Sequence, residues 1–230
     1  MHSKNLERTS LPKETKVKEV FSLDLYSPST TEVILHRLRM RKAIPFDHEY
    51  INILPNYRSQ KVTSGIGMPS LSPMVMGPIK LLIDGKQVVA NTLEALWQGS
   101  KRFVNESEEE FKIARLKFFN SASGSNHRHR SKEKVMYFEW KGQKLDYIQA
   151  REVYCRYYVQ LTNGNKDLQY LRELMSKGYK LRICGYDGHP ITDYRAAYLN
   201  PNEPFGHERV LWCLLHNVAP WEECVVKSIY

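Results

Sequence analysis

The order of apolar and polar positions predicts a chain in which strands and helices alternate. Two apolar runs on either side of Asp84 and Gly85 predict a β-hairpin over 79–90, because this dipeptide favours a tight turn. Asn91 with Glu94 three residues later predicts an N-cap and capping box, and so a helix directly after the hairpin. Further helices are expected from Ser107 and over 145–161, 167–175 (ended by Gly178) and 205–216.

The N-terminal quarter gives weaker patterns. Alternating apolar and basic positions over 31–42 favour a strand with one solvent-facing basic side, with a helix as the alternative. Residues 56–77 are rich in Ser, Pro, Gly and Met, which predicts a long loop of a kind that is more often functional than not. The expected organisation is a basic flexible leader (1–20), an N-terminal extension of undefined structure (21–60), one main domain (61–220) and a C-terminal tail (221–230).

Composition narrows the class of protein. At 230 residues with 42% hydrophobic residues, the chain is long and apolar enough to bury a substantial core. No run approaches the roughly 18 apolar residues of a membrane span, and the basic N-terminus has no apolar segment behind it. We therefore expect no membrane association, no secretion and an intracellular location, cytoplasmic or nuclear. Four widely spaced cysteines are expected to be reduced core residues.

A net charge of +9 favours an anionic partner, such as a nucleic acid, a nucleotide or a phosphorylated metabolite. The basic leader and a basic loop at 127–134 are the segments expected to contact nucleic acid. His127 and His129 lie in that loop among arginines and lysines, with no cysteine ligand nearby, so a metal site is disfavoured. A plain solvated loop is the simpler interpretation. No metal and no cofactor are expected.

The first candidate site is the helix that follows the hairpin. Glu94, Gln98 and Lys101 stand at i, i+4 and i+7 and therefore project from one helix face. Trp97 lies between them. A solvated helix also carries Glu and Lys, but a carboxylate, an amide, an ammonium and an indole on two turns are more typical of a pocket wall.

The second candidate site is the turn at 185–190. The run 179–184 predicts a central strand, and Tyr186 and Asp187 follow at its carboxyl end, where ligands of α/β proteins commonly bind. Gly185 and Gly188 permit close approach of a ligand. A simple Asp-Gly turn is the alternative interpretation.

The third candidate site is the start of the last helix, at Gly206, His207, Glu208 and Arg209. A helix N-terminus presents unpaired N–H groups to an anion, and Gly206 leaves room for a phosphate. Arg209 could pair with that phosphate in bidentate fashion. Helix capping together with a surface salt bridge explains the same residues without a ligand.

Taken together, these segments resemble the NADAR superfamily, whose members handle NAD-derived and ADP-ribose-like nucleotides and include N-glycosidases. The resemblance covers about 71–215: Leu71-Ser-Pro, Ile83-Asp-Gly-Lys, the helix 93–103, an Asp/Gly-rich turn, and Gly206-His-Glu-Arg with its apolar helix. It implies an α+β fold, a predominantly helical single domain with a small sheet or hairpin. Two positions depart from the family pattern: Asp146 stands where a tryptophan is usual, which leaves only Trp140 upstream, and Tyr186 replaces the tryptophan of the turn.

The resemblance implies an N-glycosidase that cleaves the ribosyl C–N bond of an ADP-ribose-related or phosphorylated N-riboside, including one carried on ADP-ribosylated nucleic acid. Glu94 is the first choice for the carboxylate that faces the sugar and Asp187 the second. The expected substrate contacts are Trp97 or Tyr186 stacked on the base, Lys101, Gln98 and Arg209 on phosphate or ribose oxygens, and Gly206, His207 and Glu208 at the helix start. Two alternatives stay open: a non-catalytic nucleotide or ADP-ribose binding module, and a nucleic-acid-modification protein that acts on a modified base.

Overall fold

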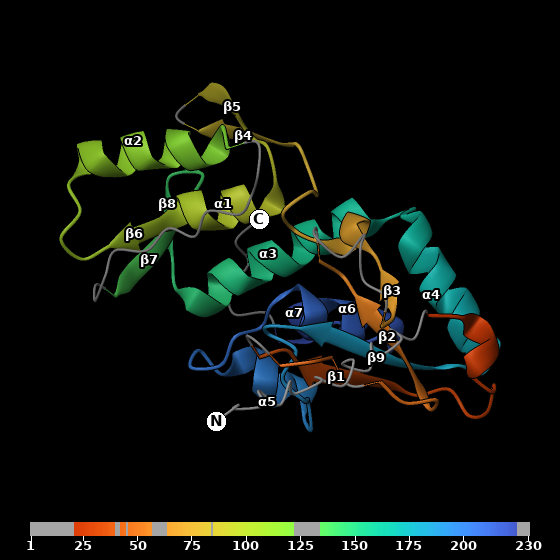
Figure 1. The fold of residues 1–230 in the computed structure, drawn as a ribbon. Helices are drawn as coiled ribbons and strands as arrows, with labels where there is room; N and C mark the ends of the chain where they lie inside the picture. Colours follow the sequence, from red (N-terminus) through yellow and green to blue (C-terminus); the bar gives the residue numbers. More distant parts are fainter. Residues whose placement is uncertain are drawn as a thin grey trace, which may run out of the picture.

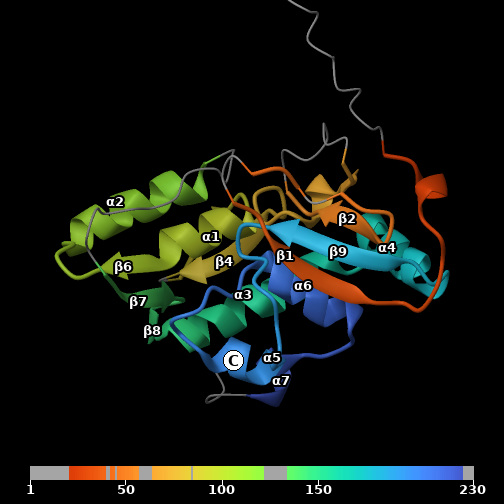
Figure 2. The same cartoon turned by 60° about the horizontal axis from the view of Figure 1, so that its bottom comes forward.

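The computed structural model describes residues 21–39, 42–44, 46–56, 64–83, 85–121 and 134–224. Its central element is a four-stranded parallel sheet with the order β1 (Val33–Arg37), β9 (Lys180–Gly185), β2 (Tyr50–Leu54) and β3 (Ile66–Gly67). The apolar side chains of one face are buried, including Val33, Ile53 and Ile183. Helix α6 (His207–Leu215) packs on β1 and β9 beneath this sheet, as Figure 2 shows.

A second group of elements lies beside the sheet (Figure 1). It contains the hairpin β4 (Ile79–Ile83) and β5 (Lys86–Ala90), and a three-stranded sheet of β6 (Lys101–Phe103), β7 (Val135–Trp140) and β8 (Gln143–Leu145). Helices α1 (Leu93–Ser100) and α2 (Glu108–Phe119) pack on each other in this group.

Helix α3 (Tyr147–Thr162) lies between the two groups and contacts both α1 and α6 (Figure 1). The remaining described helices are α4 (Lys166–Ser176), α5 (Tyr194–Leu199), α7 (Pro220–Glu223) and the 3-10 turns η1 (Leu23–Leu25) and η3 (Pro69–Leu71). None of the helices in the described ranges has the length and apolarity to cross a bilayer.

The mixed α+β class is confirmed, but the sheet is larger than the small sheet or hairpin expected. The main reason is the segment 21–60, which was expected to be an extension. Its strands β1 and β2 pair with β9 on either side, so this segment supplies one edge strand and one inner strand of the sheet. The interpretation of 56–77 as a loop without regular structure is also wrong in part, because β3 and η3 lie within it.

Most of the predicted helices are confirmed with small shifts at their ends. Ser107 and Glu110 form the capping box that opens α2. The N-cap of α1 is Thr92 rather than Asn91: the Thr92 side chain accepts a hydrogen bond from the N–H of Ala95. The predicted N-cap is therefore wrong by one residue, and the predicted capping box does not form, because Ala95 rather than Glu94 stands three residues after the N-cap. All four cysteines are reduced, and Cys155, Cys184 and Cys213 are buried, as expected.

Candidate functional site

A cavity of about 390 Å³ lies at the carboxyl end of the parallel sheet. Part of its lining comes from segments that follow strands, namely Asn56 after β2 and Tyr186 with Asp187 after β9. Pro73, which follows the 3-10 turn η3, also lines it. Helices α1 and α3 and the N-terminus of α6 form the walls. Parallel α/β sheets commonly bind ligands at this edge, and the volume lies in the range of small-molecule sites.

Helix α1 supplies the polar wall. Gln98 Nε2 donates a 2.6 Å hydrogen bond to Glu94 Oε1, and Lys101 Nζ donates a 2.8 Å bond to Gln98 Oε1. Glu94 is only 8% exposed. The expected i, i+4, i+7 row is therefore present and lines the cavity. Its last member sits just past the helix end, because α1 stops at Ser100 and Lys101 begins β6.

Local packing sets the direction in which this row points. Gly99 lies so close to the ring of Phe119 that an added Cβ would come within 2.6 Å of a ring carbon. This close approach seats one side of α1 on α2 and leaves the polar side toward the cavity. The helix start is held as well, because the Glu94 N–H donates a 3.0 Å hydrogen bond to the carbonyl of Pro73.

The aromatic wall includes residues that the sequence analysis did not single out. Tyr147, Arg151 and Tyr154 of α3 line the cavity opposite α1. The ring centroid of Trp97 lies 5.9 Å from that of Tyr147 and 5.5 Å from that of Tyr154, both edge to face. The sequence did contain a signal for this wall, because these three α3 residues stand at i, i+4 and i+7, the same spacing as the polar row of α1.

Tyr154 is held neutral in this wall. Burial, followed by the nearby Glu94 carboxylate, raises the pKa of its phenol well above the usual value of 10.0. The phenol therefore stays a hydrogen-bond donor across the physiological pH range. Trp140, the upstream tryptophan noted as a substitute for the family residue, is buried against Tyr157 and does not line the cavity.

Two further carboxylates meet where β9 ends and α6 begins. A Cβ placed on Gly206 would lie 2.8 Å from Asp187 Oδ2 and 3.0 Å from Glu208 Oε2, so both oxygens surround this glycine. The Glu208 side chain also lies directly against Gly185, so closely that any side chain at position 185 would overlap it. Glycines at 185 and 206 thus let both acids reach the cavity floor.

One oxygen of Glu208 has no hydrogen-bond partner within the described residues. Its Oε2 is buried and lies 3.2 Å from His207 Nδ1, an approach that does not meet hydrogen-bond geometry. His207 Nε2 lies 2.8 Å from the Pro55 carbonyl, which can only accept, so the ring proton belongs on Nε2. The Glu208 carboxylate thus lies beside the His207 ring, and both residues line the cavity.

Arg209 does not reach the cavity, which corrects its expected role in phosphate binding. It is 1% exposed, and its guanidinium donates to the carbonyls of Pro204 and His189 and to the Glu203 carboxylate. Arg151 acts in a similar way from the cavity wall. Its guanidinium donates to carbonyls at the end of α5 (Ala197 and Tyr198) and in the loop after it (Asn200 and Glu203).

The two buried arginines therefore fix the segment 197–206, whose end forms one wall of the cavity. Three carboxylates line the cavity, those of Glu94, Asp187 and Glu208, and two cations accompany them, the Lys101 ammonium and the Arg151 guanidinium. Such a site favours hydroxyl groups and developing positive charge.

The cavity is also lined by the other predicted site residues Trp97, Tyr186, Gly206 and His207. Tyr186 is 56% exposed at the mouth of the cavity. The leader 1–20 and the loop 127–134, apart from Lys134, lie outside the described residues. Within the described ranges, no three His, Cys, Asp or Glu side chains are grouped as metal ligands. No family model, curated protein or solved structure matches this chain.

Proposed function

We propose that this protein is an N-glycosidase that hydrolyses the ribosyl C–N bond of an ADP-ribose-related or phosphorylated N-riboside. One observation carries the proposal: Glu94 and Asp187, from distant parts of the chain, line the same cavity beside the Trp97 ring. The resemblance of these segments to the NADAR superfamily supports the same class of reaction.

The chemistry requires groups of this kind. As the bond between C1′ and the base nitrogen breaks, its electron pair leaves with the base, and the sugar becomes oxocarbenium-like. A carboxylate next to C1′ stabilises that positive charge and takes a proton from the attacking water, whose oxygen bonds to C1′. A departing guanine nitrogen takes up a proton from solvent, in balance with the proton that the carboxylate took from the water, whereas a nicotinamide leaves as the neutral base without one. The products are the free base and a ribose with a hydroxyl group at C1′ that keeps its phosphate.

We assign Glu94 to the sugar and the attacking water. Its carboxylate is buried and oriented by the 2.6 Å hydrogen bond from Gln98. Asp187, across the cavity beside Gly206, is the second carboxylate, placed to stabilise the cationic sugar. Lys101 and Gln98 would bind phosphate or ribose oxygens, while Trp97 or the exposed Tyr186 would stack on the base.

The test is product analysis of the full-length protein with a panel of N-ribosides. The panel contains ADP-ribose linked to nicotinamide or to guanine and the corresponding ribose 5-phosphates, and mass spectrometry identifies the products. Release of free base together with a ribose product supports the proposal. Calorimetric binding of ADP-ribose without any product from the panel would instead identify a binding module, and neither binding nor turnover would refute both functions.

A further inference from the structure

Two tyrosines that stand one helical turn apart on α3 use their hydroxyl groups differently. Tyr158 is fully buried, and its hydroxyl donates a 2.8 Å hydrogen bond to the Leu71 carbonyl. Tyr154 is 8% exposed and lines the cavity, but its hydroxyl makes no hydrogen bond to any of the residues that the structure describes. A nearly buried hydroxyl without a protein partner needs one from solvent or from a ligand.

The Tyr154 ring is held in place from two sides. It meets the Trp97 ring edge to face, with 5.5 Å between the centroids, and it stacks on the Tyr158 ring at 6.5 Å. Both neighbours are themselves fixed, Tyr158 by its bond to Leu71 and Trp97 by the Phe138 ring, 4.5 Å away. The direction of the Tyr154 hydroxyl is therefore set before any ligand arrives, as a preorganised donor requires.

A carboxylate faces this donor across the cavity. Glu94 has the largest effect of any charged group on the Tyr154 phenol, ahead of Glu208, and both line the same cavity. No hydrogen bond joins the phenol directly to either carboxylate within the described ranges. A group that bridges Tyr154 and Glu94 must therefore accept from the phenol and donate to the carboxylate.

This requirement selects the chemistry of the bridging group. A water molecule or an alcohol both accepts and donates through one oxygen, whereas carbonyl, ether and phosphate oxygens only accept. The arrangement is thus complementary to a hydroxyl oxygen. It does not suit the phosphates or the ring oxygen of a nucleotide.

We propose that Tyr154 and Glu94 form a hydroxyl subsite, which holds the water that attacks C1′ and afterwards the C1′ hydroxyl of the product. This rests on the proposed function and adds Tyr154 to its machinery. Tyr154 donates to the water oxygen, and the water donates to Glu94. As the C1′–N bond breaks and its electron pair leaves with the base, the water oxygen bonds to C1′. One water proton passes to Glu94 and the other stays on the new hydroxyl, while Tyr154 keeps its own proton.

The experiment compares two ligands that differ only in this hydroxyl. Calorimetry with the full-length protein measures the dissociation constants of ADP-ribose and of its analogue that lacks the C1′ hydroxyl of the terminal ribose. The test variant is Tyr154→Phe. The matched control is Tyr157→Phe, which removes a hydroxyl from the same helix at a residue that packs on Trp140 and does not line the cavity. Thermal melting should show both variants folded.

We expect the wild type to bind ADP-ribose about fivefold more tightly than the analogue, the scale of one hydrogen bond. Tyr154→Phe should lose most of this preference, and Tyr157→Phe should keep it. A wild type that binds both ligands equally, or neither, would overturn the proposal. So would equal weakening of both ligands in Tyr154→Phe, because the phenol would then contact a part that the two ligands share.

A kinetic arm tests the role of the subsite in the reaction. For any N-riboside that the wild type cleaves, Tyr154→Phe should lower kcat about tenfold and leave KM unchanged, because a misplaced water slows attack without weakening substrate binding. An unchanged kcat would remove Tyr154 from the reaction. The calorimetric arm needs no turnover, so a failure of the N-glycosidase proposal in the product panel is distinguishable from a failure of the hydroxyl subsite.

Discussion

The cavity and a second hollow, lined by residues 35–39, Lys42, Ala43 and Pro190, differ in sign and in construction. The cavity holds Glu94 and Glu208 on the buried first turns of α1 and α6, and Glu208 fits only because Gly185 has no side chain. The second hollow carries the cations Arg37, Arg39 and Lys42 on exposed side chains without acidic partners in the described ranges. A buried acid is held in one geometry, as chemistry requires, whereas exposed cations give salt-dependent attraction without fixed geometry.

The largest effect is expected inside the cavity. Glu94→Gln keeps the shape and the hydrogen-bonding capacity of the side chain but removes its charge and its basicity. Turnover of any N-riboside cleaved by the wild type should fall about 10² to 10⁴-fold, the usual contribution of a positioned acid or base. Single-turnover rates measure this loss, and calorimetry with ADP-ribose measures the binding that should persist.

Glu109→Gln is the matched control, because it makes the same change at an exposed position in the first turn of α2. Near-normal turnover in Glu94→Gln would remove Glu94 from the reaction. The assignment of the catalytic carboxylate would then pass to Asp187.

The second prediction concerns the frame that holds the cavity wall. Arg151→Met removes a guanidinium that donates to backbone carbonyls of the segment 197–203 and leaves those acceptors without partners. The free energy of unfolding should fall by about 3 kcal/mol, the order seen when buried acceptors lose a charged donor. Urea denaturation measures it. An unchanged midpoint would show that the loop does not depend on Arg151.

The third prediction concerns Glu208. Its carboxylate lines the cavity, so we expect it to accept a hydrogen bond from a ribose hydroxyl. The wild type should therefore bind a ribose-containing ligand more tightly than its 2′-deoxy analogue, and Glu208→Gln should reduce that preference by about tenfold, the scale of one charge-assisted hydrogen bond. Calorimetric dissociation constants for the two ligands check this. An identical preference in the variant would contradict the assignment.

The sequence predicted the local parts of this arrangement and missed the non-local ones. The row on α1 and the acid after β9 depend on residue spacing and strand ends, and the structure brings both to one cavity, while their roles in binding and catalysis stay predictions. The parallel pairing of β1 and β2 with β9 joins segments more than 120 residues apart, which no local pattern reveals. Arg209 was misassigned because a helix N-terminus attracts anions in general, while its side chain turns instead to the Pro204 and His189 carbonyls.

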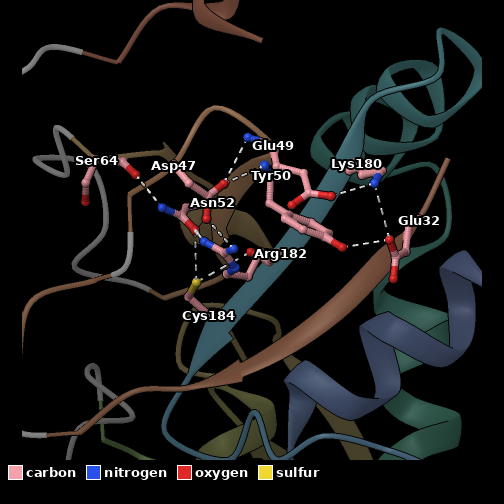
Figure 3. Close-up of polar contacts among 9 residues, drawn as sticks. All are labelled: Glu32, Asp47, Glu49, Tyr50, Asn52, Ser64, Lys180, Arg182 and Cys184. Atoms are coloured by element: carbon pink, nitrogen blue, oxygen red, sulfur yellow. Dashed lines mark hydrogen bonds and ion pairs between the residues drawn. The ribbon is translucent and has the colours of Figure 1, made fainter. Parts of the chain in front are cut away.

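The smallest expected effect concerns Arg182, a cation that is paired with the Asp47 carboxylate. Burial would raise the pKa of Asp47, but hydrogen bonds from Arg182 and from the N–H groups of Tyr50 and Glu49 hold it below its usual value of 3.8 (Figure 3). A depressed carboxyl pKa stabilises the fold above the unfolded-state value, and this stabilisation is lost as the pH falls through the lower folded-state pKa. Asp47→Asn should therefore lower the free energy of unfolding at pH 7.

We expect a cost of about 1 kcal/mol, since the Asp47 side chain is 42% exposed and solvent screens the pair. Urea titrations should show the difference from the wild type shrinking below about pH 4, where the unfolded carboxyl becomes protonated, and disappearing at lower pH once the native carboxylate is protonated as well. The variant also leaves the charge of Arg182 uncompensated beside His36, so the pKa of His36, followed by NMR, should fall further. An unchanged pKa of His36 would mean that the charge of Arg182 does not act on this side chain. The positive charge in the hollow at the end of β1 would then come from Arg37, Arg39 and Lys42 alone among the described residues that line it.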